Sequence, residues 1–241
     1  ATGVGFALGP NDVAVRCNFC TVDPSGKITD RRAGRIPTEK SGRLADMLDK
    51  NVTIPGVEVF VRPVKEHRFV VVFRAEGLGG RVEDTDPQKT GVAPLEPVAV
   101  DQASQRTAEV AAEFIAQARK LLADQAAANC LTMRGFSEKP DMPTYEEVYG
   151  VRAAAIAAYP MYKGLAQLVG MEIVGKPDTL QQEIDVLEQA WGAFDFFFVH
   201  FKYTDSRGED GDFDAKVKMV EEFDSVISRV EALNPNVLIV T

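Results

Sequence analysis

Five carboxylates between residues 205 and 214 form a dense cluster of potential metal ligands. They follow an apolar stretch and precede a long amphipathic one: Asp205, Glu209, Asp210, Asp212 and Asp214. Hard divalent cations prefer oxygen ligands, and clustered carboxylates repel one another unless a cation or a helix N-terminus offsets their charge. The spacing does not match an EF-hand loop. The run therefore predicts either a divalent metal site or a solvated loop in which Asp212 or Asp214 caps the next helix.

A cluster of arginines in the first third of the chain could bind an anion. Arg31, Arg32 and Arg35 lie close together in the sequence, and Arg16 and Arg68 belong to predicted strands. Guanidinium groups hold carboxylate and phosphate through paired hydrogen bonds. The cluster therefore predicts a site for a small, doubly anionic molecule, and surface salt bridging with nearby acids is the alternative.

The cysteines do not indicate a dithiol or zinc site. Cys17 and Cys20 match C-x-x-C, but side chains three apart on a strand point to opposite faces of the sheet. A zinc site would need further ligands, and only Cys130, His67 and His200 remain. The sequence also contains no Walker A motif, no dinucleotide-binding glycine motif after a strand and no G-x-S-x-G. Nucleotide binding and serine hydrolysis thus have no support.

The first half of the chain predicts a sheet covered by helices. Residues 13–22 and 28–32 form one expected hairpin, residues 58–62 and 68–74 form a second, and residues 38–50 fit a short helix. The pattern that follows predicts a long loop, a helix and a second loop, over residues 75–100, 102–126 and 133–142 respectively.

Apolar strands alternate with helices from residue 150 onwards. The expected strands are 152–158, 171–174, 195–201 and 237–240, and the expected helices between them are 161–169, 179–191 and 213–233. This alternation is typical of a parallel sheet with helices on both faces, an α/β fold. Ligands of such sheets bind at the carboxyl ends of the strands, where the acidic run lies.

The composition excludes several classes of protein. With 45% hydrophobic and 26% charged residues the chain has a globular composition, and no apolar run approaches the length of a membrane helix, so no membrane association is expected. The net charge of −9 argues against a nucleic-acid partner, although residues 1–74 carry 12 basic and 8 acidic residues. The 3 cysteines predict a reducing compartment, and no signal peptide is apparent.

Several motifs together resemble one family. They follow one another along most of the chain: Asp12-Val-Ala-Val-Arg-Cys-Asn-Phe, Asp30-Arg-Arg-Ala-Gly-Arg-Ile, His67-Arg68, Asp84-Thr-Asp-Pro, Met133-Arg-Gly, Tyr159-Pro-Met-Tyr-Lys-Gly, and Phe198-Val-His-Phe-Lys-Tyr-Thr-Asp-Ser-Arg-Gly-Glu-Asp-Gly-Asp-Phe. In these motifs the chain is similar to the archaeal-type cofactor-independent phosphoglycerate mutases of the alkaline phosphatase superfamily.

The resemblance implies a metal-binding, alkaline-phosphatase-like α/β core with an inserted α+β substrate domain. On this chain, residues 1–9 would end an amino-terminal core segment, residues 10–142 would form the insert, and residues 143–241 would form part of the core. Such enzymes are cytoplasmic and interconvert 3-phosphoglycerate and 2-phosphoglycerate through a phosphoserine. They use two divalent ions, manganese or magnesium, and no 2,3-bisphosphoglycerate.

The resemblance also implies roles for individual residues. Asp205 matches a metal ligand, and Glu209 occupies a place where related enzymes often have histidine. Asp84 and Asp86 are candidates for proton transfer to the substrate hydroxyl. The residues expected to contact the small phosphorylated acid are Arg16, Arg31, Arg32, Arg35, Arg68, Arg134 and Lys163.

Three parts of the family pattern have no counterpart in this sequence: the amino-terminal metal-binding Asp, the nucleophilic Ser and a Gly-Asp-His motif after the last strand. We therefore expect an internal fragment of such an enzyme that is inactive alone. Two alternatives are another phosphomutase or phosphonate-related enzyme of the superfamily and a non-catalytic module that binds phosphorylated acids. Oligomeric state does not follow from the sequence.

Overall fold

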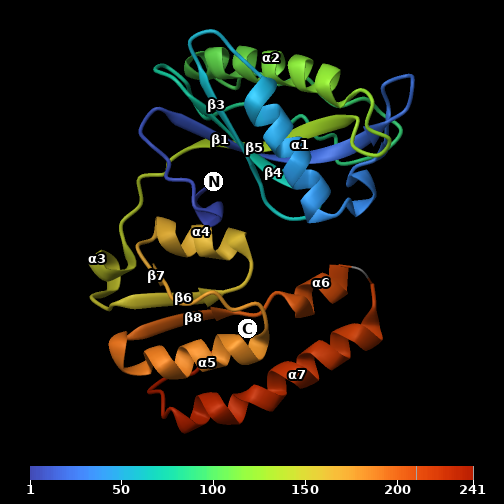
Figure 1. Ribbon diagram of the computed structural model, residues 1–241. Coiled ribbons are helices and arrows are strands. Elements are labelled where there is room, and N and C mark those ends of the chain that lie inside the picture. Colours follow the sequence, from blue (N-terminus) through green and yellow to red (C-terminus); the bar gives the residue numbers. More distant parts are fainter. Residues whose placement is uncertain (210, 241) are drawn as a thin grey trace. The chain divides into compact units, whose positions relative to one another are not determined.

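The computed structural model describes residues 1–209 and 211–240, with the backbone but not the side chain of Glu209. The chain divides into two compact units, one comprising Gly3–Pro140 and the other beginning at Asp141 (Figure 1). Each unit has its own hydrophobic core. Among the described residues, no helix combines the length and apolar character needed to cross a bilayer.

Unit 1 is built on an antiparallel sheet. Its strands are β1 (Asp12–Val22), β2 (Ile28–Asp30), β3 (Glu58–Pro63), β4 (Arg68–Arg74) and β5 (Cys130–Glu138). The order β2-β1-β4-β3 confirms both predicted hairpins, and β5 pairs with β1 on the side that β4 leaves open. β1 is thus the central strand, with neighbours from distant parts of the sequence.

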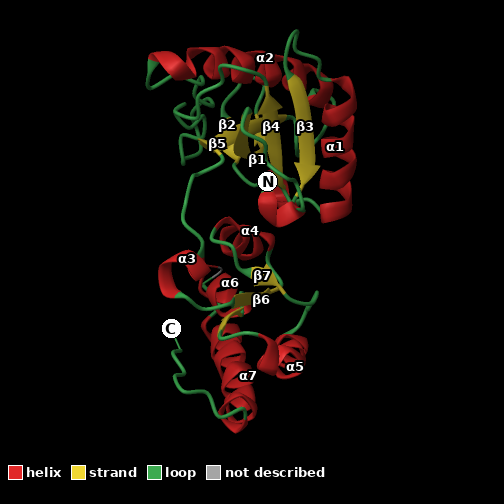
Figure 2. Cartoon of the chain, turned by 90° about the vertical axis from the view of Figure 1, so that its left-hand side faces the viewer, coloured by secondary structure: helices red, strands yellow, loops and turns green. Residues whose placement is uncertain are grey.

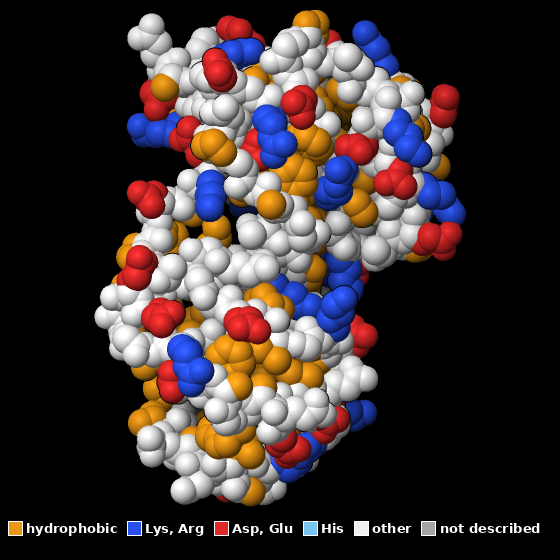
Figure 3. Space-filling view, turned by 60° about the vertical axis from the view of Figure 1, so that its left-hand side comes forward, with side chains coloured by type: hydrophobic (Ala, Val, Ile, Leu, Met, Phe, Trp, Pro, Cys, Tyr) orange, Lys and Arg blue, Asp and Glu red, His pale blue; other side chains and the backbone are white. Residues whose placement is uncertain are grey.

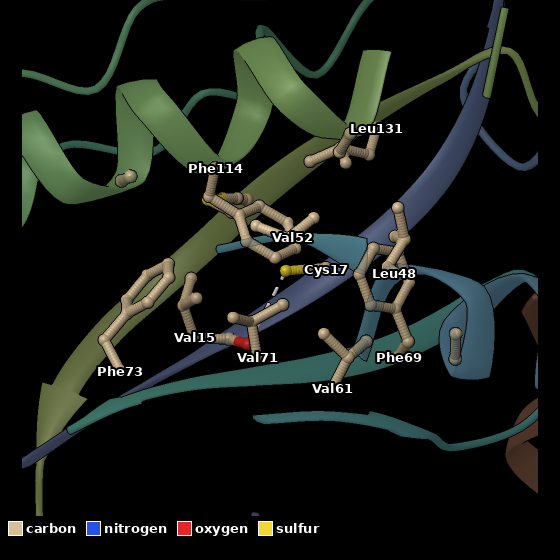
Figure 4. Close-up of a cluster of buried hydrophobic side chains, with 14 of the residues drawn as sticks. Val15, Cys17, Leu48, Val52, Val61, Phe69, Val71, Phe73, Phe114 and Leu131 are labelled. Carbon is tan, nitrogen blue, oxygen red and sulfur yellow. Dashed lines mark hydrogen bonds between the residues drawn. The ribbon is translucent and has the colours of Figure 1, made fainter. Parts of the chain in front are cut away.

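Two helices, α1 (Thr38–Asn51) and α2 (Gln105–Leu122), cover one face of this sheet. Figure 4 shows Phe114 of α2 and Leu48 of α1 pointing towards Cys17, Phe69 and Val71 of the sheet. Successive side chains of a strand point to opposite faces, so the odd-numbered residues of β1 enter this core. Both helices present apolar residues at intervals of three and four, as the sequence predicts.

The same alternation directs polar side chains to the opposite face of the sheet. Arg16 lies across from Arg134 in β5, and Asn18 lies across from Arg68 in β4 and Thr132 in β5. Register therefore gathers three arginines that are widely separated in the sequence. This face of unit 1 is called the basic face below.

One prediction for unit 1 is wrong. Residues 133–142 were expected to form a loop, but β5 extends to Glu138 because Ser137 and Glu138, like Met133 and Arg134, pair with β1. Gly135 and the charged residues around it are not typical of a strand, so the local sequence does not predict this part of β5, which long-range pairing with β1 stabilises. The expected long loop at residues 75–100 is confirmed, with one isolated bridge between Val82 and Ala99.

Unit 2 contains a parallel sheet of order β7-β6-β8. The strands are β6 (Ala153–Ala157), β7 (Glu172–Ile173) and β8 (Phe196–His200). The helices are α3 (Tyr145–Tyr149), α4 (Pro160–Leu168), α5 (Leu180–Ala190), α6 (Tyr203–Glu209) and α7 (Phe213–Ala232). α4 lies on one face of the sheet, and α5 and α7 lie on the other (Figures 1 and 2). The predicted mixed α/β arrangement with helices on both faces is confirmed.

The predicted strand at residues 237–240 is not formed. Val237 and Ile239 are 74% and 78% exposed, and the segment borders a hollow of about 1310 Å³ beside β8 and α7. An apolar run becomes a strand only when a neighbour accepts its ladder of hydrogen bonds, and no described strand pairs with this segment. The acidic run also differs from the expected loop, because it begins within the short helix α6.

Candidate functional site

The arginine cluster after β2 sits on a strained backbone turn. Ala33, Gly34 and Arg35 have φ angles of 47°, 63° and 50°, values that non-glycine residues adopt rarely. The carboxylate of Asp30 stabilises the turn by accepting hydrogen bonds of 2.7 Å from the backbone N–H groups of both Arg32 and Gly34. The turn therefore fixes the direction in which consecutive arginines leave the chain.

His67 reveals where several of these arginines converge. Its side chain is 1% exposed, and its Nδ1 atom has no hydrogen-bond partner in the described part of the chain. Burial and the positive charges of four arginines lower the pKa of His67 to about 4; the four are Arg68, Arg32, Arg16 and Arg35. These arginines come from β1, β4 and the turn after β2, so the structure brings together the cluster that the sequence predicted.

Arg31 leaves the same turn but is held by Asp86. The Asp86 carboxylate accepts hydrogen bonds from Nε and Nη2 of Arg31, at 3.1 and 2.8 Å, and from the backbone N–H of Gln88 at 2.9 Å. Burial alone would raise the pKa of Asp86, but these hydrogen bonds and the charges of Arg31 and Arg134 outweigh it and hold the pKa below its usual value.

Arg134 on β5 contacts the same segment. Its Nη1 lies 3.7 Å from Asp86, and its Nε lies 3.4 Å from Asp84. Asp84 also accepts a hydrogen bond from the backbone N–H of Gly135. Thr85, between the two aspartates, exchanges hydrogen bonds with the backbone of Met133, so residues 84–86 are anchored along β5. The face of unit 1 visible in Figure 3 shows Lys and Arg side chains interspersed with acidic ones, consistent with such pairing.

A second group of polar side chains lies at the carboxyl ends of β6 and β8 in unit 2. The ring of Tyr162 in α4 stacks on His200 at a centroid distance of 3.3 Å, and the Lys202 ammonium lies 5.9 Å from the ring centroid of Tyr159. Parallel strands end at the same edge of a sheet, which brings the residues after β6 next to those after β8. Lys163, the neighbour of Tyr162, belongs to this edge.

Glu183 of α5 is a residue that the sequence reasoning missed. It is 1% exposed, and one carboxylate oxygen, Oε2, has no partner among the described residues. Burial raises its pKa to about 7, while a hydrogen bond from the backbone of Ala158 and the charge of Lys163 act in the opposite direction. Its position in phase with the buried Leu180 and Leu187 was the signal in the sequence, because a carboxylate on an apolar helix face is costly.

The predicted metal ligands do not form a metal site in the described part of the chain. Asp205 is 57% exposed on its side chain and forms an ion pair with Lys202. The side chain of Glu209 lies outside the described residues. No group of three or more His, Cys, Asp or Glu side chains among the described residues is arranged to hold an ion.

The cysteines behave as expected for C-x-x-C on a strand. Cys17 enters the helix-covered core, whereas Cys20 points to the other face and lies directly across from Cys130 of β5. The interaction between these two neighbouring thiols lowers the pKa of Cys130 despite burial, and it raises that of Cys20, which burial raises further. All three cysteines are free and buried.

Known proteins are similar to this chain in sequence, and solved structures are similar to it in fold. A protein of Thermotoga neapolitana named "Probable 2,3-bisphosphoglycerate-independent phosphoglycerate mutase" is 48% identical over all of this chain and 60% of its own length. A protein of Aquifex aeolicus with the same name is 45% identical over all of this chain and 61% of its own length. This chain therefore spans less than two thirds of the length of these relatives.

Solved structures agree with these relatives. The cofactor-independent phosphoglycerate mutase of Thermoplasma acidophilum superposes with a TM-score of 0.63 at 26% identity, over 96% of this chain and 64% of that one. A protein of Pyrococcus horikoshii shares the fold with a TM-score of 0.72 at 22% identity, over 96% of this chain and 57% of that one. The sequence profile of the 2,3-bisphosphoglycerate-independent phosphoglycerate mutases matches residues 1–128. The chain belongs to this family.

Proposed function

We propose that the full-length protein interconverts 3-phosphoglycerate and 2-phosphoglycerate without 2,3-bisphosphoglycerate, and that the basic face of unit 1 binds the phosphoglycerate. The observation that carries this proposal is the convergence of four arginine charges on the buried, neutral side chain of His67. Arg68 also forms an ion pair of 3.2 Å with Glu66, and guanidinium groups gathered around one buried ring can together hold an anionic ligand through several charge-assisted hydrogen bonds. Family membership supports a phosphorylated acid as that ligand.

The arginines suit the two anionic groups of a phosphoglycerate. A guanidinium group offers a rigid, planar set of donors that matches both carboxylate and phosphate. We assign substrate contacts in unit 1 to Arg16, Arg31, Arg32, Arg35, Arg68 and Arg134. The contact of Lys163 is assigned on the family resemblance alone. We also propose that residues 10–142 form a substrate domain inserted into an alkaline-phosphatase-like core, of which residues 1–9 and 143–241 are parts. The separate hydrophobic cores of the two units support the boundary near residue 142, whereas residues 3–9 group with unit 1.

The metal dependence implied by the family is a further part of the proposal. Asp205 and Glu209 would supply carboxylate ligands to one of two divalent ions, manganese or magnesium, in the full-length protein. The described residues do not fit an ion on their own, because Asp205 is paired with Lys202 and no third ligand is near. We also place the enzyme in the cytoplasm, which its free cysteines support.

The proposal is tested by kinetics on the full-length protein. Formation of 2-phosphoglycerate from 3-phosphoglycerate is followed by coupling to enolase, with divalent ions present and 2,3-bisphosphoglycerate absent. Replacing Arg32 by alanine should lower kcat/KM by about tenfold or more, because one charge-assisted hydrogen bond is worth about 1.5–3 kcal/mol. Arg43→Ala is the matched control, since Arg43 is an exposed arginine of α1 that pairs with Glu39.

Each outcome bears on the proposal. The proposal is supported if the wild type converts 3-phosphoglycerate, the Arg43→Ala variant keeps this activity and the Arg32→Ala variant loses most of it. A wild-type protein that binds 3-phosphoglycerate without converting it would instead indicate a binding module. No binding and no turnover would refute both the substrate and the assigned site.

A further inference from the structure

We propose that Asp86, assisted by Asp84, is a positioning residue that presets Arg31 and Arg134 for the substrate, and that Asp86 does not itself transfer a proton. The inference rests on the proposed function and deepens it, because it names what orients two of the proposed substrate contacts. Arg31 and Arg134 are held by carboxylates within the protein.

The first support is that both oxygens of the Asp86 carboxylate already accept hydrogen bonds within the protein. Its side chain is 2% exposed, and it accepts three hydrogen bonds, two from Arg31 and one from the backbone N–H of Gln88. Arg134 lies within ion-pair distance of the same Oδ2 atom that Arg31 contacts. A general base needs an oxygen that can reach a substrate hydroxyl, and Asp86 has none exposed.

The second support is the protonation state of Asp86. Hydrogen bonds and nearby guanidinium groups hold its pKa below the usual value for a carboxyl. A general base works best when its pKa lies near the operating pH, so a carboxylate with a lowered pKa accepts a proton poorly. The same features make Asp86 a permanent anion that can orient a guanidinium group.

The third support is that the arginines themselves remain accessible. The side chains of Arg31 and Arg134 are each 32% exposed, whereas the carboxylate between them is buried. Arg31 contacts Asp86 through Nε and Nη2, which leaves its Nη1 group without a role in that pair. An arginine side chain loses rotamer freedom when it is immobilised, and Asp86 imposes that entropy cost before the ligand arrives.

Asp84 extends the arrangement to β5. It contacts Nε of Arg134 and accepts a hydrogen bond from the backbone N–H of Gly135, and Thr85 ties the segment to Met133. Arg31, Asp86 and Arg134 come from three separate segments of the chain, so the aspartates fix their spacing. A fixed spacing between two guanidinium groups selects for ligands whose anionic oxygens match it.

A double-mutant cycle on the full-length enzyme tests the inference. Asp86→Asn keeps the shape of the side chain but removes its charge, and it should raise the KM for 3-phosphoglycerate about tenfold or more while kcat falls less. In an Arg31→Ala background the same change should raise KM by a smaller factor, because one of the two arginine partners of Asp86 is already missing and only Arg134 remains. Asp49→Asn is the matched control, since Asp49 also pairs with an arginine and a backbone N–H, but on α1.

The outcomes separate the inference from the proposed function. A wild-type enzyme without turnover or substrate binding overturns the proposed function itself. An active wild type in which the Asp86→Asn and Arg31→Ala effects simply multiply, or in which kcat alone collapses with the pH profile of a lost base, overturns the positioning role. If Asp86→Asn does not fold, the Arg31→Lys variant provides the test. A KM near that of the wild type would overturn the inference, because a positive charge alone would then suffice. A tenfold rise in KM would support a preset guanidinium fork.

Discussion

The ionisation of His67 offers a direct test of the proposed anion site. Burial and four arginine charges lower its pKa to about 4, compared with 6.5 for an unperturbed histidine. A bound phosphoglycerate carries about two negative charges near pH 5, because the second phosphate pKa is about 6. These charges offset part of the arginine field, so binding should raise the pKa of His67 by about one pH unit.

The size of the effect follows from linkage. One pH unit corresponds to about 1.4 kcal/mol, so the ligand should bind about tenfold more tightly when His67 is protonated. The same linkage governs stability. His67 takes up a proton near pH 6.5 in the unfolded chain but only near pH 4 in the folded chain. The free energy of unfolding is therefore undiminished by this group above pH 6.5, and it decreases as the pH falls from 6.5 to 4. The total loss is about 3 kcal/mol.

The measurement is practical because the chain has only 2 histidines. Selective labelling of their imidazole rings gives two NMR titration curves, and a His200→Gln variant identifies which curve belongs to His67. Titrations run with and without saturating 3-phosphoglycerate, and Arg32→Gln serves as a second perturbation that should raise the pKa by removing one positive charge.

Two results would contradict this reasoning. A His67 pKa near 6.5 in the free protein would mean that the arginines do not converge on a buried ring. A low pKa that stays unchanged when 3-phosphoglycerate is shown to bind would place the ligand away from the four arginines.

Three further outcomes are expected. Burial raises the pKa of Glu183 to about 7, so the folded state loses stability as the pH rises from 4.5 through 7, and Glu183→Gln should therefore stabilise the protein more at pH 8 than at pH 4.5, by up to about 3 kcal/mol. Equal changes in melting temperature at the two pH values would exclude this. Asp30→Ala should cost about 1–2 kcal/mol in denaturant unfolding and weaken substrate binding, since two backbone N–H groups of the strained turn lose their acceptor, and an unchanged midpoint would count against that role. The 3 cysteines should resist thiol reagents in the native protein and react in denaturant, because burial outweighs the lowered pKa of Cys130; rapid native labelling would show that the sheet opens locally.

Local patterns determined most of the elements. Runs of apolar β-branched and aromatic residues in 13–22 and 68–74 predicted β1 and β4, and apolar residues at helical spacing predicted α1, α2, α5 and α7. The failures occurred where a partner decides the outcome. β5 is a strand because β1 pairs with it, and residues 237–240 are not a strand because no described strand pairs with them.

The sequence by itself also determined the chemistry available to the site: an arginine cluster, a pair of aspartates and an acidic run, in the order typical of one family. It could not determine which charges neutralise one another. Register across β1, β4 and β5 brings Arg16, Arg68 and Arg134 to one face, and the loop at residues 75–100 carries Asp86 onto Arg31. Electrostatic interactions depend on distance and burial in three dimensions, so only the tertiary structure decided that Asp86 is a committed ion-pair partner and that His67 is neutral.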